Sequence, residues 1–237
     1  MIRADLHVHS CLSPCAQITM VPSVISHVSK EKQLDFLSIT DHNCCDNLAS
    51  FDKKMKNSMI AGVELTSFEE VHILAYFYSI SDALNLCSFV KRFLPKINYD
   101  PELMGYQIVV DEQDEFQKLE EDFLGIALQL SLSDLIEVVC SHGGIPVYAH
   151  IERRFGVLYQ LGVFPKDERV RLAEARSKEG WVEAIKSGFV VLSNSDAHSP
   201  DEIGCRFTRF AMQYPDSKEL VDILAAPSRE KVFSLWD

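Results

Sequence analysis

The chain has 237 residues, of which 47% are hydrophobic and 24% charged, so it can bury a substantial core and has the composition of a globular protein. Its formal net charge of −12 argues against a broad electrostatic DNA or RNA interface, although bound metal ions could still attract an anionic substrate. No signal peptide or membrane span is visible and the seven cysteines are an odd number, so we expect a soluble cytoplasmic protein with reduced thiols.

In the first half of the chain, short apolar runs alternate with helical periodicity. The runs predict strands over residues 4–8, 36–40, 59–63 and 71–77. A helix is expected after Pro22, which suits a first helical turn, and a second after Asp46, whose side chain could cap it. The second helix would bury Leu48, Phe51 and Met55, and a third would open at Ser81.

Residues 95–122 interrupt this rhythm with prolines, a short β-rich run and an acidic stretch. We interpret them as an insertion, or as a strand-turn element laid on the main domain. Beyond them, Ser131 begins a capping-box pattern before a helix that ends at Gly143–Gly144.

The alternation then resumes to the end of the chain. Strands are expected over residues 145–149, 189–193 and 207–212, whereas residues 170–173 could be strand or helix. Helical patterns cover residues 181–185 and the segment that follows Asp216. Repeated strand-helix units predict a parallel sheet with helices outside, and one α/β domain over residues 1–237, as a barrel, is the simplest account.

Histidines at strand ends are the strongest functional signal. Of eight histidines, six lie at or near the ends of expected strands: His7, His9, His42, His72, His150 and His198. Sites of parallel α/β folds are built at the C-terminal edge of the sheet, although His72 lies nearer the start of its strand. Residues two apart on a strand point to the same side, so His7 and His9 can face one ion, and Asp196 with His198 repeats that spacing.

Six short motifs occur in order between residues 5 and 198, and together they resemble the PHP (polymerase and histidinol phosphatase) superfamily. The motifs are Asp5-Leu6-His7-Val8-His9-Ser10, Thr40-Asp41-His42-Asn43, Gly62-Val63-Glu64, His72-Ile73-Leu74-Ala75-Tyr76, Ala149-His150 and Ser195-Asp196-Ala197-His198. The resemblance implies a distorted (β/α)7 TIM-like barrel, a trinuclear metal centre and phosphoesterase activity.

The resemblance also implies a role for each motif residue. The first metal would be held by His7, His9, Glu64 and Asp196, and Glu64 would bridge to a second metal completed by His72 and His150. His42 and His198 would hold a third, at which Cys15 lies nearest the position where many relatives have a His or Asp. Such ligands suit two to three divalent ions of Zn, Fe or Mn, and a thiolate from Cys15 would favour Zn or Fe over Mn.

The expected activity is that of a metal-dependent phosphoric ester hydrolase. Two cations that share a hydroxide make it a nucleophile near neutral pH, with Glu64 and Asp196 in the catalytic centre. Arg153 is a candidate for clamping a phosphate oxygen, although a surface ion pair explains it equally well. Asp5 and Asp41 are expected to orient ligand histidines. The substrate would be a small phosphorylated metabolite or nucleotide, selected by residues 95–122 and the loop after Arg153.

Two other functions remain open. An amidohydrolase-like C–N hydrolase also uses a His-x-His strand end, but it usually bridges its metals with a carboxylated lysine, where this chain offers Glu64. A non-catalytic module, stabilised by its metals and docked on a larger partner, would be expected to lack ligands. Cys44 and Cys45 follow the His42 motif and could be soft ligands or redox-sensitive thiols, but we interpret them as small loop residues. The oligomeric state cannot be read from the sequence.

Overall fold

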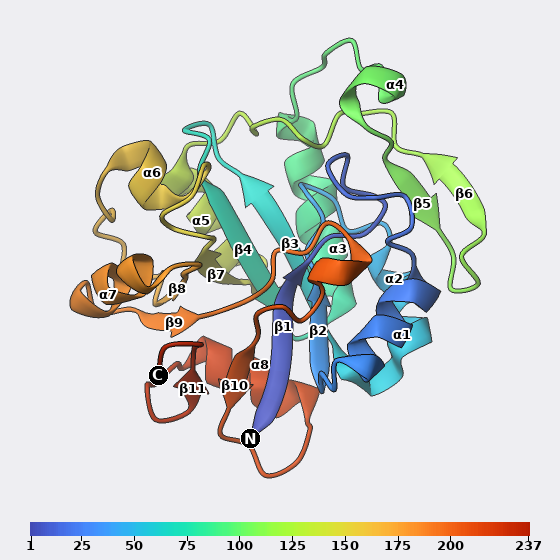
Figure 1. Cartoon of the computed structure of the whole chain (residues 1–237). Coiled ribbons are helices and arrows are strands. Elements are labelled where there is room, and N and C mark those ends of the chain that lie inside the picture. The colour runs from blue at the N-terminus through green and yellow to red at the C-terminus, as the bar shows by residue number, and fades with distance from the viewer.

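The computed structural model of the protein describes residues 1–237, in which eleven strands alternate with eight α-helices (Figure 1). The strands are β1 (Ile2–Val8), β2 (Phe36–Ile39), β3 (Met59–Thr66), β4 (His72–Phe77), β5 (Ile108–Val110), β6 (Phe116–Leu119), β7 (Ile145–Tyr148), β8 (Leu172–Glu174), β9 (Val190–Leu192), β10 (Thr208–Phe210) and β11 (Val232–Phe233). The helices are α1 (Pro22–Glu31), α2 (Leu48–Met55), α3 (Ile80–Val90), α4 (Pro101–Met104), α5 (Leu132–Ser141), α6 (Val157–Leu161), α7 (Lys178–Lys186) and α8 (Ser217–Ala225).

Nine strands form one sheet in the order β11-β10-β1-β2-β3-β4-β7-β8-β9. The pairs β1–β2, β2–β3, β7–β8 and β8–β9 are parallel, but β4 runs antiparallel to both of its neighbours, and β10 runs antiparallel to β1 and β11. The prediction of a parallel sheet is therefore wrong for these strands. The physical reason lies in the connection from β3 to β4, which spans only residues 67–71 and is too short for the crossover that parallel strands need.

The sheet nearly closes on itself, which confirms the expected distorted TIM-like barrel. After β9, the Ser193 N–H donates to Thr208 Oγ1 at 2.9 Å, and the Thr208 hydroxyl donates back to the Ser193 carbonyl at 3.1 Å. The Leu235 N–H reaches Ser193 Oγ at 3.2 Å. These bonds join the β9 edge to the β10–β11 edge through side chains, so the two ends of the sheet lie together without a complete ladder.

Apolar side chains from the nine strands of the main sheet fill the barrel interior. One buried cluster unites Leu6 of β1, Leu74 of β4 and Leu192 of β9, and Leu220 and Leu224 of α8 pack against it. A second cluster lies between the sheet and helices α1, α2 and α3, where Phe51 and Phe77 are buried. Successive residues of a strand point to opposite faces, so each strand serves both layers. None of the helices is long and apolar enough to cross a membrane.

Two local predictions are wrong. Asp46 does not cap α2, because the N-cap residue is Asn47 and the Asp46 carboxylate instead accepts a hydrogen bond from Lys118 Nζ at 2.7 Å. The expectation of reduced thiols fails for one pair, since Cys45 and Cys87 form a disulfide between the segment before α2 and helix α3. The other five cysteines, Cys44 among them, are free.

The segment of residues 95–127, called the hairpin segment below, stands apart from the main sheet. It contains α4 and the antiparallel pair β5–β6, a separate two-stranded sheet. In Figure 1 these green elements lie at the upper right, whereas β1 starts near the N-terminus at the bottom. The strand-turn structure that was expected is present, and its status as an insertion stays a prediction.

Candidate metal centre

The six predicted histidines converge at one edge of the barrel. His7 lies near the end of β1 and His9 just after it, while His42 and His150 follow β2 and β7. His72 is the first residue of β4. Because β4 runs antiparallel to β3 and β7, its first residue lies at the same edge of the sheet as the C-terminal ends of β3 and β7. The short reversal from β3 to β4 therefore brings a histidine to the site from the beginning of a strand.

Backbone pairing beyond the regular strands brings the motifs into contact. Val8 and Ala197 form an isolated parallel bridge, in which the His9 N–H donates to the Ala197 carbonyl at 2.9 Å. This bridge sets the pair His7 and His9 beside the pair Asp196 and His198. A second parallel bridge joins His42 to Glu64.

Left-handed backbone conformations recur at these positions. The φ angles are 52° at Asn43, 23° at His150 and 52° at Asp196, and Phe155, close to the site, has 66°. Non-glycine residues rarely adopt such angles, and they cluster where a functional geometry has to be held. The strain indicates that the motif side chains are aimed by the surrounding structure.

Glu64 is the centre around which the histidines gather, and its side chain is only 1% exposed. Its Oε1 lies 2.9 Å from His72 Nδ1, 3.1 Å from His150 Nε2 and 3.4 Å from His7 Nε2. Its Oε2 lies 3.1 Å from His42 Nδ1 and 3.3 Å from His9 Nε2. Each oxygen thus faces its own set of nitrogens, an arrangement suited to a carboxylate that bridges two cations.

Three compact groups of possible ligands overlap in this cluster. They are His7 with His9 and Asp196, His9 with His42 and His198, and His42 with Glu64 and His72, and the ligand atoms of each group lie within 4.8 Å of one another. The first group contains three of the four ligands expected for the first metal and lacks Glu64. The other two place His9 beside the third predicted site and His42 beside the second, so the clusters share ligands more than the sequence indicated.

Tautomers fixed by hydrogen bonds show that the cluster fits cations. His7 Nδ1 lies 3.1 Å from Glu174 Oε2 and must donate to that carboxylate. His9 Nδ1 lies 2.9 Å from Ser13 Oγ, whose own proton is donated to Asp41, so His9 Nδ1 also donates. In the neutral rings both Nε2 atoms then carry lone pairs, and these face each other at 3.2 Å. Only a proton or a metal ion between such atoms removes their repulsion.

Glu174 is the residue that sequence reasoning missed. It ends β8, is fully buried, accepts from His7 through both oxygens, and also accepts from Asn194 Nδ2 at 2.9 Å. A carboxylate in this position fixes the ring orientation of a metal-binding histidine and raises its basicity. The sequence feature that could have indicated Glu174 is a carboxylate directly after a strand. Residues 170–173, which precede it, could be strand or helix from the sequence alone, so the feature was not recognised.

The two predicted orienting aspartates act differently. Asp41 accepts from Ser13 Oγ at 2.6 Å and thereby holds the hydroxyl that His9 contacts, so it orients that ring through Ser13. Asp5 accepts from the backbone N–H groups of Ser195 and Gly204. Its hydrogen bonds therefore position the backbone segment that carries Asp196 and His198, and the expectation that it orients a ligand histidine stays a prediction.

Carboxylates and histidines shift one another's pKa values. Burial alone would lower the pKa of His7, but Glu174, Glu64 and Asp196 outweigh it and raise that pKa well above its usual range. Burial acts likewise on His9, whose bonds to Asp196 and Glu64 raise its pKa to about 9. Burial and the nearby His9 charge lower the pKa of His198 to about 4. Glu64 has a pKa well below its ordinary value, because the surrounding histidines overcome its burial.

A cavity of about 570 Å³ opens above the cluster and is lined by seven of the nine predicted ligands, all except His7 and His9. Cys15 belongs to none of the three compact groups, so its role as a ligand stays a prediction. Arg153 and Arg154 line the same cavity, and Arg153 Nη1 lies 3.5 Å from Asp196 Oδ2. Arg176, which the sequence did not indicate, lies at the same distance from that oxygen.

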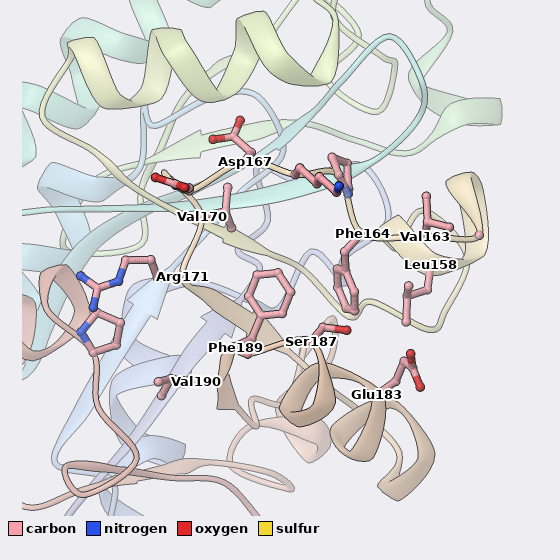
Figure 2. Close-up of a pocket in the computed structure, with 16 residues that line it drawn as sticks. Leu158, Val163, Phe164, Asp167, Val170, Arg171, Glu183, Ser187, Phe189 and Val190 are labelled. Carbon is pink, nitrogen blue, oxygen red and sulfur yellow. The ribbon is translucent and has the colours of Figure 1, made fainter.

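A larger cavity, of about 990 Å³, lies at the opposite edge of the barrel, by the starts of β8 and β9. Figure 2 shows Phe164 and Phe189 side by side in it, with Val170 and Leu158 nearby. No histidine or cysteine lines it, and none of the possible metal-binding groups lies there. The cluster around Glu64 is therefore the candidate functional site.

Comparison with known proteins supports a family relationship over the last part of the chain. A family described as PHP-associated matches residues 179–226, a stretch that includes Asp196 and His198. Together with the ordered motifs, this match confirms the resemblance drawn from the sequence. No curated protein sequence matches the chain.

Solved structures share the fold at low sequence identity. A lesion-specific endonuclease from Pyrococcus furiosus has a TM-score of 0.72 and 19% identity, and the match covers 98% of this chain but only 57% of the endonuclease. A protein of Bifidobacterium adolescentis assigned as a metal-dependent phosphoesterase has a TM-score of 0.60 and 15% identity, covering 94% of this chain and 95% of that one. An amidohydrolase from Chromobacterium violaceum has a TM-score of 0.58 and 17% identity, covering 98% and 97%.

We predict that Glu174→Gln weakens metal binding by about 10–100-fold, since an amide cannot hold the His7 ring as a carboxylate does. Equilibrium dialysis with Zn or Mn, followed by elemental analysis, measures the change. Glu183→Gln, an exposed position on α7, is the matched control and should bind metal like the unchanged chain. Equal metal affinity in the two variants would show that Glu174 does not support a ligand.

Metal binding should also release protons. In the metal-free protein His9, with a pKa of about 9, is protonated at pH 7.5, and a cation has to displace that proton. Metal affinity should therefore rise between pH 7 and pH 9. Calorimetric titrations in buffers of different ionisation enthalpy measure the number of protons released. Metal binding without proton release would contradict the assignment of these histidines as ligands.

Proposed function

We propose that this chain, a member of the PHP superfamily, is a metal-dependent hydrolase that cleaves a phosphate ester at the cluster around Glu64. The observation that carries the proposal is the convergence of six histidines with Glu64 and Asp196 at one barrel edge, with the His7 and His9 lone pairs aimed at a common point. Imidazole with carboxylate ligation suits Zn, Fe or Mn.

The ligands fall into sets that would hold two or three ions. His7, His9 and Asp196 would hold one, His72 and His150 would hold a second on the other side of Glu64, and His42 with His198 would complete a third, to which Cys15 could add a thiolate. When bound, such ions supply an activated water and electrostatic stabilisation of the phosphoryl oxygens.

The chain's own side chains prepare this chemistry. Glu64 is kept ionised by the histidines around it, so both oxygens remain available for bridging. Burial works against ionisation of Asp196, but His7 and His9 hold its pKa far below the usual range, so it stays a charged ligand. His7 and His9 are oriented by Glu174 and by Ser13 with Asp41.

Arg153 is the proposed phosphate clamp. Its distance of 3.5 Å from Asp196 Oδ2 is too long for a strong hydrogen bond, and its side chain is 54% exposed. Its remaining N–H donors are therefore free to bind a phosphate oxygen above the cluster, in the forked geometry that guanidinium groups favour.

Two observations favour an ester over the alternatives. No lysine lines the cavity, so the carboxylated lysine usual in amidohydrolases has no counterpart here, although an amidohydrolase shares the fold. Eight of the nine predicted ligands lie together, whereas a non-catalytic docking module would be expected to lack some of them.

A nucleic-acid substrate is the second candidate. The fold is similar to that of a lesion-specific endonuclease, and this likeness weighs against the sequence argument that the charge of −12 disfavours long nucleic acid. Because the chain spans 57% of that enzyme, its activity is a hypothesis here. A duplex with an abasic lesion therefore belongs in the substrate panel.

The test is to purify the protein without chelator, count its metals, and assay phosphomonoesters, phosphodiesters and the lesion duplex. We expect two or more metals per chain, hydrolysis of at least one ester, and a loss of about 10²–10³-fold in kcat for Glu64→Gln. Metal-loaded protein that is inert on every ester would contradict the proposal.

Arg153→Ala in the same assay separates the clamp from the metals. It should keep the full metal content and lose kcat, and Arg153→Lys should not restore it, since an ammonium lacks the forked donors. Arg229→Ala, which removes an arginine outside the cavity, is the matched control. Unchanged turnover in Arg153→Ala would leave Arg153 with the role of a surface ion pair.

A further inference from the structure

We propose that the hairpin segment is a fixed wall of the substrate cavity and that Phe123 selects esters whose leaving group carries a flat aromatic ring. The inference rests on the proposed function, because it assigns a substrate class to the same site. It concerns the part of the cavity lining that contains no proposed metal ligand.

The wall is apolar, whereas most of the other residues that line the cavity are polar or charged. The hairpin segment contributes Met104, Phe123, Ile126 and Ala127 to the lining, and all four are half-buried. The barrel edge contributes histidines and carboxylates to the same cavity. Apolar side chains left partly open beside such a polar centre indicate that a ligand covers them, since binding sites combine an apolar lining with a few polar groups.

Hydrogen bonds hold the wall in place. Asn43, which follows the predicted ligand His42, donates through Nδ2 to the carbonyls of Leu124 at 2.8 Å and Ile126 at 3.0 Å. Gln107 is fully buried, and its Oε1 accepts from the Leu124 N–H at 2.7 Å. Gln107 Nε2 also donates to the Asp122 carbonyl at 3.0 Å. The residues on both sides of Phe123 are thus tied to Gln107, directly before β5, and the following ones also to the metal-site loop, so the wall is pre-organised and loses little entropy on binding.

Phe123 is supported as an aromatic platform. Its ring lies 5.4 Å from that of Tyr99, and it sits over Gly125, where a Cβ would come within 2.7 Å of the ring. Glycine at 125 therefore makes room for the phenyl group. A second ring, Phe155, lines the same cavity and stacks on His72 at 4.7 Å with an angle of 8°. Two aromatic rings in one cavity favour a flat aromatic ligand, because offset and edge contacts between rings add to simple burial.

The size of the cavity sets the scale of the ligand. A volume of about 570 Å³ accommodates a small molecule, a nucleotide included. A leaving group of one or two rings would fill the space between the metal ligands and the wall.

The test is a binding measurement on metal-loaded protein with non-hydrolysable probes. Methylphosphonate, cyclohexylphosphonate and phenylphosphonate share the anion and differ in the group that would meet the wall. By calorimetry, we expect phenylphosphonate to bind about tenfold more tightly than methylphosphonate, and cyclohexylphosphonate to gain less, because offset and edge contacts between aromatic rings add to apolar burial.

Variants of Phe123 decide whether the wall causes the preference for the phenyl probe. Phe123→Ala should remove the phenyl preference, and Phe123→Leu, which keeps apolar volume and guards against a folding defect, should reduce it toward the cyclohexyl level. Phe116→Ala removes an exposed phenylalanine from β6 of the same segment, outside the cavity, and should leave all three affinities unchanged.

The outcomes separate this inference from the proposed hydrolysis. Equal affinity for the phenyl and methyl probes, or a phenyl preference that survives both Phe123 variants, overturns the inference. A phenyl preference that depends on Phe123 in a protein that hydrolyses no ester supports the wall and defeats the hydrolase. Hydrolysis of an ester without any phenyl preference supports the hydrolase and contradicts the wall.

Discussion

The site depends on one constraint: nitrogen lone pairs and carboxylate oxygens are packed together, out of water, around Glu64. The side chains of His7 and His9 are fully buried, and Glu64 is 1% exposed. Isolated charges in such a place are costly unless they are paired or bound to metal. The hydrogen bonds to Glu174 and Ser13 leave the two Nε2 atoms no proton to share between neutral rings, so the arrangement requires positive charge at its centre.

The rest of the fold can be understood as support for that cluster. The antiparallel strand β4 delivers His72 to the edge where β1, β2 and β7 end, and two isolated bridges bring the remaining motifs beside them. Left-handed backbone at His150 and Asp196 aims side chains that regular strands would direct elsewhere. Asn43 connects this edge to the hairpin segment, so the metal ligands and the proposed substrate wall share one set of hydrogen bonds.

Much of this site could be predicted from sequence, because the chemistry lies in residue types at recognisable spacings. The pairs His7 with His9 and Asp196 with His198 were legible from the two-residue repeat of a strand, and they meet in the structure. Glu174 was not legible, because β8 has only three residues and its periodicity is too short to identify. The direction of β4 was missed because a hydrophobic pattern does not encode whether a strand pairs parallel or antiparallel. The link between Cys45 and Cys87, 42 residues apart, depends on tertiary contact that spacing alone does not reveal.

The most direct measurement is a crystal structure of the metal-loaded protein with anomalous diffraction at the edges of Zn, Fe and Mn. The account predicts at least two ions, one on each side of Glu64: the first held by His7, His9 and Asp196, and the second by His72 and His150. Ions bound only elsewhere, or a cluster that stays free of metal while its histidines are protonated, would contradict the claim that this barrel edge is a metal centre.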